Sequence, residues 1–460
     1  MPLREQTVLV LGLGDTGLSM VRWLLGAGAT VRVADSRQDP PHLKTLQTEF
    51  PDIRTDCGPF HEASFEGIDL IALSPGVPLA EPLVQDAVRR GIPVTGDVEL
   101  FARALNKYFP RVRCIAITGS NGKSTVTSMV GAMCVKAGFN TVVAGNIGLP
   151  VLDALAKVLA SGETPDIFVL ELSSFQLETT RSLYPDAATV LNISEDHMDR
   201  YPNLAAYAGV KARIFNGEGV QVINRDDPLV DRMGQSGRRV WTFSRHAPVS
   251  PSDFGIAEVD GQPALAQGSR VLMRAGELQV TGLHNATNAL AAFALCRALD
   301  MPEGPLLAAL REFRGLPHRV EPIAEVADVT WYDDSKGTNV GATVAALDGF
   351  DRPVVLIAGG DGKGQDFAPL AGPVKARARA VVLIGRDAPA IETALRSTGV
   401  PLQRADSLPE AVRACATLAQ PGDAVLLSPA CASLDMFRNY AHRAEVFVDA
   451  VRRLPGARTS

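Results

Sequence analysis

The sequence predicts an α/β protein of three domains whose sheets are mostly parallel. Two glycine-rich stretches favour this class, because each directly follows an apolar strand pattern and opens a helical pattern. Elsewhere, short and nearly continuous apolar runs alternate with helical patterns, as expected for parallel strands that are covered on both faces. The chain has 460 residues, a length that suggests about three such domains.

Composition excludes several classes of function. Hydrophobic residues make up 46% of the chain and charged residues 21%, and the formal net charge is -6, so a nucleic-acid partner is not expected. The 6 cysteines show no C-x-x-C spacing, which argues against a zinc site or a disulfide framework. Because the chain has no leader pattern and no apolar run long enough to span a membrane, we expect a cytoplasmic protein, and we expect a monomer.

The order of the strand patterns predicts where each domain lies. Residues 1–108 form the first predicted domain, in which TVLVLGLGDTGLSMVRWLLGAGATVRVAD reads as strand, glycine turn, helix and strand. Residues 109–315 form the second, with apolar runs in CIAITGS, TVVAGN, DIFVLELSS, AATVLNIS and VQVINRDD. Residues 316–460 form the third, with apolar runs in VTWYDDS, PVVLIAGG, AVVLIG and AVLLSPA.

The glycine turn of the first domain predicts a site for a phosphate or nucleotide. Gly12, Gly14 and Gly17 stand in G-x-G-x-x-G register after a strand, which lets a backbone approach a pyrophosphate at a helix N-terminus. Asp35 ends the next strand, where a carboxylate can bond a ribose or a similar polar group. Taken alone this motif favours NAD, so a dinucleotide-dependent dehydrogenase is one hypothesis. The alternative is that the glycines only pack a helix on a strand.

The stretch ITGSNGKST predicts a nucleotide triphosphate site in the second domain. Its common form has glycine where this chain has Ile117, but Gly119 and Gly122 still leave backbone amides free to face phosphate oxygens. Lys123 supplies a cation for the β and γ phosphates, and Ser124 supplies a hydroxyl for Mg²⁺.

Two further stretches of the second domain supply candidate metal ligands. Glu171 ends a buried strand in DIFVLELSS, where a carboxylate beside a phosphate loop can reach the metal. His197 lies in the acidic stretch NISEDHMDRY and is a candidate ligand of a second metal ion, although such a stretch is as often a solvated turn. A P-loop switch or assembly factor without enzymatic activity is therefore a further hypothesis.

Eight motifs, in this order, resemble those of the Mur ligases: TGSNGKST, ELSSFQLE, NISEDHMDRY, GLHNATNALAA, GLPHR, DDSKGTN, GGDGKG and LLSPACASLDMF. The resemblance covers nearly the whole chain and is closest to the members that add D-glutamate. It implies an N-terminal Rossmann-like domain for the UDP-substrate, a central P-loop ATPase-like domain for ATP, and a C-terminal Rossmann-like domain for the amino acid. No redox cofactor is implied. Folylpolyglutamate synthase is less similar after DDSK, and the DNPR stretch typical of the diaminopimelate- or lysine-adding relative is absent.

The resemblance implies four sets of site residues. ATP would contact Gly119, Ser120, Asn121, Gly122, Lys123, Ser124, Thr125, Asn285, Asn288, Arg319 and Asp334. The UDP-substrate would contact Gly14, Asp15, Thr16, Gly17, Asp35, Ser36, Ser74, Gly76, Asn146 and His197. D-Glutamate, with its two carboxylates, would contact Lys336, Thr338, Lys363, Ser433 and Tyr440. The metal ions, expected to be two Mg²⁺, would be held by Ser124, Glu171, His197 and Lys211.

The resemblance also implies the reaction. The terminal carboxylate of UDP-N-acetylmuramoyl-L-alanine would attack the γ-phosphate of ATP, and the D-glutamate amine would then displace phosphate from the acyl phosphate, in cytoplasmic peptidoglycan precursor synthesis. Lys123, Lys211, His197 and Glu171 are the expected catalytic residues. Read alone, Lys211 in YAGVKARIF is an exposed helix lysine, whereas the resemblance implies a lysine carbamylated by CO₂.

Overall fold

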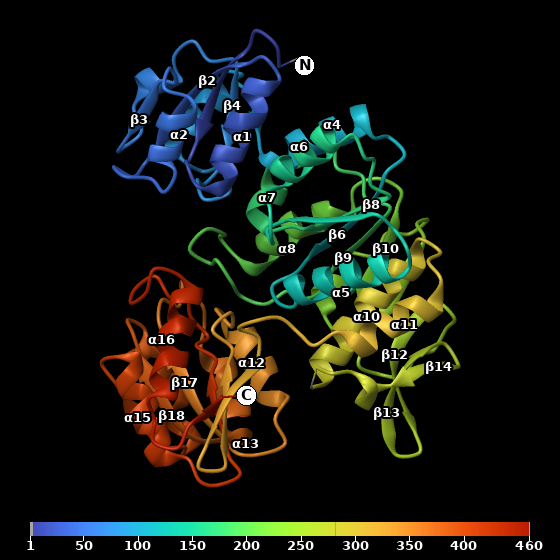
Figure 1. Ribbon diagram of the computed structural model, residues 1–460, viewed down its shortest axis with the longest axis vertical. Coiled ribbons are helices and arrows are strands. Elements are labelled where there is room, and N and C mark those ends of the chain that lie inside the picture. Colours follow the sequence, from blue (N-terminus) through green and yellow to red (C-terminus); the bar gives the residue numbers. More distant parts are fainter. Residues whose placement is uncertain (1–2, 281, 460) are drawn as a thin grey trace.

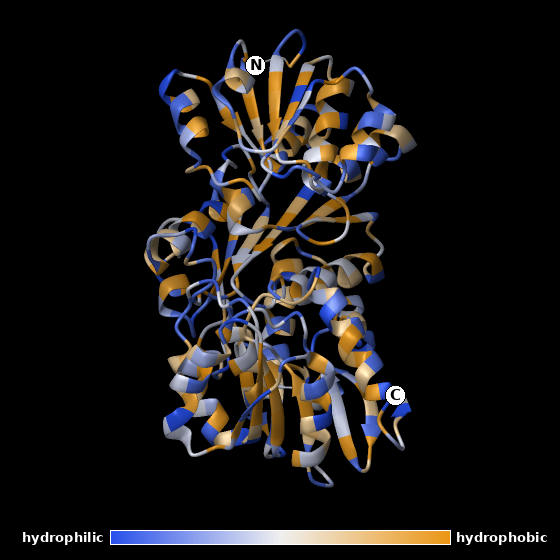
Figure 2. Cartoon of the chain, turned by 90° about the vertical axis from the view of Figure 1, so that its left-hand side faces the viewer, coloured by the Kyte–Doolittle hydropathy of each residue, from blue (hydrophilic) through white to orange (hydrophobic). Residues whose placement is uncertain are grey.

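The computed structural model describes residues 3–280 and 282–459, which form three sheets with covering helices. Figure 1 shows these three bodies arranged along the long axis, with the second between the first and the third. The predicted α/β class is confirmed. Apolar residues run through the central strands of the sheets, while polar residues gather at the outer surfaces (Figure 2).

The first sheet is parallel and has the strand order β3-β2-β1-β4-β5. Its strands are β1 (Thr7–Leu11), β2 (Thr30–Asp35), β3 (Thr55–Cys57), β4 (Leu70–Leu73) and β5 (Val94–Thr95). Its helices are α1 (Asp15–Gly26), α2 (Leu43–Glu49) and α3 (Pro82–Arg89). The continuous apolar runs of β1 and β4 are buried because helices cover both faces of the sheet.

The second sheet has the order β14-β13-β12-β11-β10-β9-β6-β8-β7 and is parallel from β7 to β12. Its parallel strands are β6 (Arg113–Thr118), β7 (Thr141–Gly145), β8 (Ile167–Glu171), β9 (Ala187–Val190), β10 (Val220–Asn224), β11 (Val240–Phe243) and β12 (Asp253–Val259). Two antiparallel strands, β13 (Gln262–Gln267) and β14 (Arg270–Arg274), extend it. The associated helices are α4 (Asp97–Tyr108), α5 (Lys123–Lys136), α6 (Val151–Ser161), α7 (Ser174–Glu178), α8 (Leu204–Ala212), α9 (Pro228–Asp231), α10 (Leu283–Ala298) and α11 (Glu303–Glu312).

Helix α4 lies on the second sheet, although the sequence places it at the end of the first domain. The ring of Phe101 in α4 meets that of Phe168 in β8 edge-on, with centroids 5.2 Å apart. Glu99 accepts hydrogen bonds from the backbone amides of Arg181 and Ser182. The apolar face of α4 is therefore buried against the second body. A helical pattern shows that one face is apolar but not which body will bury it.

The third sheet has the order β19-β18-β17-β20-β16-β15-β21 and is parallel from β19 to β16. Its strands are β15 (Glu321–Val326), β16 (Val329–Asp333), β17 (Val354–Gly359), β18 (Ala378–Ile384), β19 (Leu402–Arg404), β20 (Ala424–Leu427) and β21 (Arg458–Thr459). Its helices are α12 (Val340–Asp348), α13 (Ala371–Arg377), α14 (Ala388–Leu395), α15 (Leu408–Leu418) and α16 (Tyr440–Arg452). Within the described ranges, no helix is both long and apolar enough to cross a membrane.

Candidate functional site

The phosphate loop joins the centre of the second sheet to the N-terminus of α5. Gly122 adopts φ 81° there, and a Cβ at this position would meet Asn288 Oδ1 at 2.8 Å, so glycine is needed for both conformation and space. Lys123 Nζ donates to the carbonyl oxygens of Gly119 (2.8 Å) and Ser120 (2.9 Å). The ammonium therefore lies across the loop, beside a helix N-terminus that favours anions.

Ser120 and Asn121 tie this loop to the neighbouring strand end. The amide of Ser194 donates to Ser120 Oγ (2.9 Å), which in turn donates to the Ser194 carbonyl (3.0 Å). Asn192 Oδ1 accepts from the amide of Asn121 (2.8 Å). These two predicted ATP residues thus shape the loop, and Asn192 and Ser194 are partners that the loop motif did not reveal.

The Glu171 side chain is suited to ligate a cation. It ends β8, which pairs with β6 so that Glu171 stands beside Ile117, and its side chain is 1% exposed. Oε1 accepts a hydrogen bond from Asn146 Nδ2 at 2.7 Å, whereas Oε2 is buried and has no hydrogen-bond partner among the described residues. A buried carboxylate oxygen without a donor is costly unless a cation or another group binds it.

Lys211 is buried, in contrast to the exposed position that its helix pattern suggests. Its residue is 1% exposed, and Nζ donates to the Gly119 carbonyl (2.9 Å) and to Thr118 Oγ1 (3.2 Å). Nζ also lies 4.7 Å from the centroid of the Tyr207 ring. Burial, together with the nearby Lys123 ammonium, lowers the pKa of Lys211 well below its usual value.

His197 and Asp196 follow β9, the strand on the other side of β6. His197 has φ 58°, and burial lowers its pKa to about 4, so the imidazole is neutral at neutral pH and can ligate a metal. Asp196 forms an ion pair with Lys363 and accepts from Asn339 Nδ2 at 3.2 Å. Among the described residues, only His318, Glu321 and Asp333 place three possible metal-ligand atoms within 4.8 Å of one another, so Glu171 and His197 do not belong to such a group.

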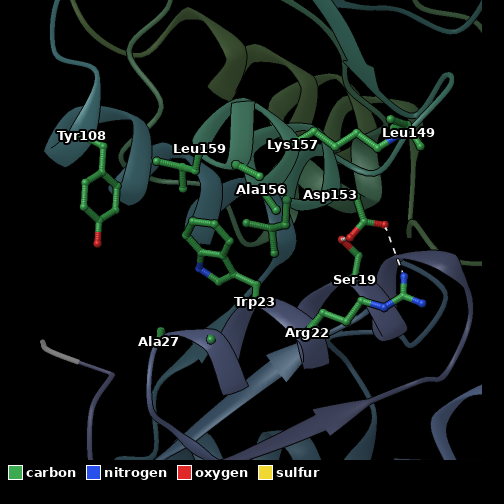
Figure 3. A pocket seen from close by; sticks show the side chains of 13 residues that line it. Ser19, Arg22, Trp23, Ala27, Tyr108, Leu149, Asp153, Ala156, Lys157 and Leu159 are labelled. Atoms are coloured by element: carbon green, nitrogen blue, oxygen red, sulfur yellow. Dashed lines mark hydrogen bonds and ion pairs between the residues drawn. The ribbon is translucent and has the colours of Figure 1, made fainter. Parts of the chain in front are cut away.

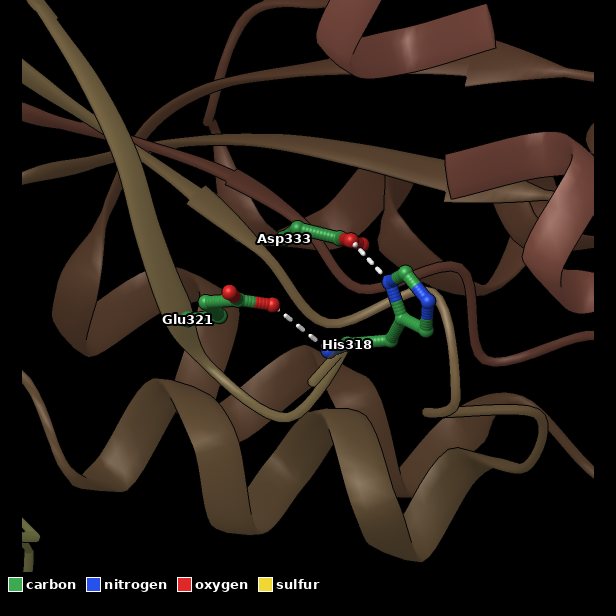
Figure 4. Close-up of side chains that lie close together, drawn as sticks. All are labelled: His318, Glu321 and Asp333. Carbon is green, nitrogen blue, oxygen red and sulfur yellow. Dashed lines mark hydrogen bonds and ion pairs between the residues drawn. The ribbon is translucent and has the colours of Figure 1, made fainter. Parts of the chain in front are cut away.

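The His318 cluster instead supports the loop that carries Arg319 (Figure 4). His318 Nδ1 lies 2.6 Å from Asp333 Oδ2, and Glu321 accepts from the backbone amide of His318 at 2.9 Å. His318 and Val320 both have positive φ, which bends the backbone on either side of Arg319. Arg319 thereby reaches the phosphate loop, where it donates to Ser124 Oγ at 3.0 Å.

Three other predicted ATP residues approach the same region. Asn288 lies against Gly122, as the close Cβ contact shows, and its Nδ2 is 3.4 Å from Asn285 Oδ1. Asp334 is buried and accepts from Ser428 Oγ at 2.6 Å. Burial raises the pKa of Asp334 to about 7, against the opposing effects of Ser428 and Arg319.

The residues predicted to bind the amino acid follow strands that are neighbours in the third sheet. Lys336 and Thr338 come after β16, Lys363 after β17 and Ser433 after β20, and the carboxyl ends of these parallel strands share one edge. Lys336 Nζ lies 3.7 Å from the centroid of the Tyr440 ring, and burial lowers its pKa to about 8. This edge faces the phosphate loop, because Lys363 and Arg319 both contact residues of the second body.

The glycine turn of the first sheet is closely packed. A Cβ on Gly17 would lie 1.9 Å from the Gly12 carbonyl oxygen, and Ser74 Oγ donates to that same oxygen at 3.1 Å. The Asp35 carboxylate is buried and accepts from the amide of Leu13 (2.6 Å) and from the Arg37 guanidinium. Asp35 and Ser74 therefore hold the turn in this structure, and contact with a ligand would require Asp35 to exchange partners.

A cavity of about 620 Å³ lies between the first two bodies, and we call it the substrate cavity because the UDP-substrate is predicted to contact part of its lining. Three predicted UDP-substrate residues line it: Asp15, Thr16 and Asn146. Asp15 Oδ1 lies 2.6 Å from His42 Nε2, which also lines the cavity. The lining does not include Ser36, Gly76 or His197, so the structure does not bring the whole predicted set to one wall.

Arg200 joins the first body to the second beside the substrate cavity, whose lining includes Pro75, and the sequence did not predict this contact. Its guanidinium donates to the Pro75 carbonyl of the first body (2.7 Å) and to Glu178 of the second (2.7 Å), and it lies 3.9 Å from the Phe175 ring centroid. The only signal in the sequence was its place in NISEDHMDRY, where an arginine after several acidic residues is typical of a solvent-exposed ion-pair partner of those residues.

Comparisons with known proteins cover most of the chain. Three family models match: "Mur ligase MurD-like, N-terminal domain" at residues 6–96, "Mur ligase middle domain" at 117–296, and "Mur ligase, glutamate ligase domain" at 318–431. The UDP-N-acetylmuramoylalanine--D-glutamate ligase of Nitrosospira multiformis is 58% identical over 100% of this chain and 98% of its own. The protein of that name from Methylobacillus flagellatus is 60% identical over 98% of each chain.

Solved structures show the same three-domain fold at much lower identity. UDP-N-acetylmuramate-alanine ligase MurC from Thermotoga maritima matches with a TM-score of 0.62 and 19% identity, over 97% of this chain and 99% of that one. MurF from Acinetobacter baumannii matches with a TM-score of 0.63 and 16% identity, over 98% of this chain and 92% of that one.

Proposed function

The chain belongs to the Mur ligase family, and from this premise we propose that it is the ATP-dependent ligase that joins D-glutamate to UDP-N-acetylmuramoyl-L-alanine in peptidoglycan precursor synthesis. The observation that carries the proposal is the hydrogen bond from Arg319 to Ser124. It joins the loops of the third sheet, with their lysines, to a phosphate loop, so a nucleotide and an acidic amino acid can meet there.

Each body would hold one reactant. Residues 1–108 would hold the UDP-substrate with the substrate cavity at its edge, residues 109–315 would hold ATP, and residues 316–460 would hold D-glutamate. The edge of the third sheet suits a dicarboxylate, because Lys336, Lys363 and the hydroxyl of Ser433 follow adjacent strands. We expect the enzyme to act as a monomer.

Positioning and charge stabilisation account for the chemistry. The amides of the phosphate loop and Lys123 would orient the γ-phosphate for attack by the substrate carboxylate, which yields an acyl phosphate and ADP. Arg319 and Lys123 would offset the negative charge that gathers at the transferred phosphoryl group. The D-glutamate amine, held by the third body, would then attack the acyl carbon and release phosphate through a tetrahedral intermediate.

The residues present fit Mg²⁺, which we propose as the metal, with two ions bound. The unpartnered Oε2 of Glu171 and the hydroxyl of Ser124 would hold one ion, and the neutral His197 imidazole would contribute to the second. When bound, Mg²⁺ reduces the repulsion between the phosphates and the attacking carboxylate.

We also propose that Lys211 is carbamylated. An unprotonated amine attacks CO₂ and loses a proton, which converts the side chain to an anion. Lys211 is suited to this step because it is buried near Lys123 and, among the described residues, no carboxylate forms a hydrogen bond or ion pair with it. The carbamate would then lie near the metal ligands, where an ammonium would be repelled.

Phosphate release tests the proposed function. Purified protein with ATP, Mg²⁺ and UDP-N-acetylmuramoyl-L-alanine should release phosphate with D-glutamate but not with L-alanine, L-lysine or meso-diaminopimelate. Equal rates with L-alanine would contradict the assignment. ATP turnover that needs neither amino acid nor UDP-sugar would favour a P-loop switch, and a saturable NADH fluorescence signal in the micromolar range would favour a dehydrogenase.

A further inference from the structure

A second cavity, of about 820 Å³, lies between the first and second bodies on the side of α1 and α6 away from the glycine turn. We call it the α1–α6 cavity. Apolar and aromatic side chains from α1, the end of α4, the loop before α6 and α6 itself dominate its lining: Trp23, Tyr108, Leu149, Leu152, Ala156 and Leu159. In Figure 3, Trp23 projects from α1 toward Leu159 and Ala156 of α6. The volume and lining are those of a small-molecule site at a domain interface.

The apolar side chains of this cavity are not covered by the rest of the fold. Tyr108 is 50% exposed, Leu149 40% and Leu159 41%, and all three line this cavity. Single exposed apolar residues are common on protein surfaces, whereas a cluster that lines a concavity marks a binding site.

The charged residues at the rim indicate the kind of ligand. Asp153 accepts from Ser19 Oγ at 2.8 Å and lies 3.9 Å from Arg22, which is also bonded to Glu49. Lys157 has no hydrogen-bond or ion-pair partner among the described residues. Because Arg22 is paired with Glu49 and Asp153, Lys157 is the lining cation that remains for an acidic group on the ligand.

The α1–α6 cavity adjoins the substrate cavity. Arg22, Leu149 and Asp153 line both cavities. Leu149 belongs to the loop after β7, whose Gly145 amide donates to the Leu149 carbonyl at 3.0 Å and whose Asn146 bonds Glu171. A molecule that displaces Leu149 or Asp153 therefore alters a wall of the substrate cavity.

We propose that the α1–α6 cavity binds a small amphipathic molecule with an apolar ring or chain and one acidic group, and that this binding weakens the binding of the UDP-substrate. The apolar part packs on Trp23, Ala156 and Leu159, and the acidic group pairs with Lys157. The effect on substrate is reciprocal, because by thermodynamic linkage two coupled ligands change each other's affinity by the same factor.

The fluorescent probe 8-anilinonaphthalene-1-sulfonate tests the binding site, since it carries an aromatic body and one sulfonate. We expect saturable 1:1 binding with a Kd on the order of 10 to 100 µM, unchanged by saturating ATP. Ala156→Trp should weaken binding at least tenfold by filling the cavity, whereas Ala390→Trp, at an exposed helix position of the third body, should not. Lys157→Glu should weaken binding more than the control Lys375→Glu. Near-ultraviolet circular dichroism checks that each variant remains folded.

Several outcomes would overturn the site. Absence of saturable binding, binding that Ala156→Trp leaves intact, or displacement of the probe by ATP would each do so. If a second copy of the chain covers this surface instead, sedimentation will show a dimer that Ala156→Trp dissociates, which also contradicts the proposal.

The effect on substrate rests on the proposed function and is measured separately. With the probe saturating, the KM for UDP-N-acetylmuramoyl-L-alanine should rise at least threefold in the wild type but not in Ala156→Trp, while the KM for ATP stays constant. An unchanged KM for UDP-N-acetylmuramoyl-L-alanine with the probe bound would contradict the coupling between the two cavities but not the binding of the probe. Absence of phosphate release without the probe would contradict the proposed function and leave the binding result valid.

Discussion

Lys363 and Asp196, 167 residues apart in the chain, form an ion pair that joins the third body to the second. Asp196 follows β9 beside the phosphate loop, and Lys363 follows β17 at the edge proposed for D-glutamate. In this arrangement the Asp196 carboxylate takes the cation that a substrate carboxylate would need. D-Glutamate would therefore replace one carboxylate partner of Lys363 with another.

The first prediction concerns the affinity for D-glutamate. Lys363→Ala removes a charge-assisted hydrogen bond worth about 2 to 3 kcal/mol, so the KM for D-glutamate should rise roughly 30- to 150-fold. The KM for ATP should change little. Lys375→Ala, at an exposed lysine of the same body, is the control. Steady-state phosphate release measures both constants, and an unaltered KM for D-glutamate would remove Lys363 from the amino-acid site.

The second prediction concerns the phosphate loop. Lys123→Ala removes the cation that lies across the loop and should lower the rate on the order of a thousandfold, or about 4 kcal/mol. Lys136→Ala removes an exposed lysine from the other end of α5, where it pairs with Glu312, and should retain activity. Activity of Lys123→Ala within tenfold of the wild type would mean that this loop is not catalytic.

The third prediction concerns Lys211. Lys211→Ala should nearly abolish ligation, and high concentrations of acetate or formate should partly restore it by occupying the position proposed for the carbamate. Methylammonium is the matched probe of opposite charge, and it should not restore activity. Rescue by methylammonium rather than formate would show that the amine is the active form. A melting curve close to that of the wild type would show that the variant is folded.

The fourth prediction concerns two glycines of one motif. Gly17→Ala places a Cβ 1.9 Å from the Gly12 carbonyl oxygen, so it should destabilise the first body by about 1 to 3 kcal/mol or more and weaken binding of the UDP-substrate. Gly14→Ala meets no atom within 4 Å and should cost at most about 1 kcal/mol. Chemical denaturation and calorimetric titration with the substrate compare the two. Equal stability of both variants would contradict the packing argument.

The fifth prediction concerns the pH dependence of stability. Asp97 is 1% exposed, and burial raises its pKa to about 6 from the ordinary 3.8. The folded protein therefore binds the Asp97 proton more tightly than the unfolded chain, so this residue's contribution to stability is complete below pH 4 and is lost as pH rises through about 6.

Asp97→Asn removes the loss of stability that ionisation of Asp97 causes as pH rises, because the asparagine side chain does not ionise. The stability of the variant relative to the wild type should grow by about 3 kcal/mol between pH 4 and pH 7. Urea titrations at several pH values measure this difference, with the exposed Asp449→Asn as control. A difference that stays constant with pH would show that the pKa of Asp97 is the same in the folded and the unfolded protein.

Much of the fold was determined by short-range patterns. The continuous apolar runs at 114–117 and 424–427 predicted buried parallel strands, and both lie inside sheets with helices on each face. The glycines at 119 and 122 and the lysine after them predicted the phosphate loop, because loop conformation and helix start depend on neighbouring residues. These conformational preferences depend on residues close together in the chain, so they can be predicted from the sequence.

Tertiary packing decided which side chains meet. Lys211 has the sequence context of an exposed helix lysine, yet it is buried under the phosphate loop because Tyr207 and the end of β6 enclose that face of α8. Helix α4 lies within the predicted first domain, yet it packs on the second sheet because its apolar face contacts β8.

The same limit applies to contacts between the bodies. By itself, the sequence determined the three-domain α/β class, the phosphate loop and the candidate residues at the ends of strands. Only the tertiary structure decided that Arg319 reaches Ser124 and that Asp196 pairs with Lys363. Charge pairing across a long separation depends on how whole bodies dock and on which carboxylates burial leaves without water, and no local preference of the chain encodes either.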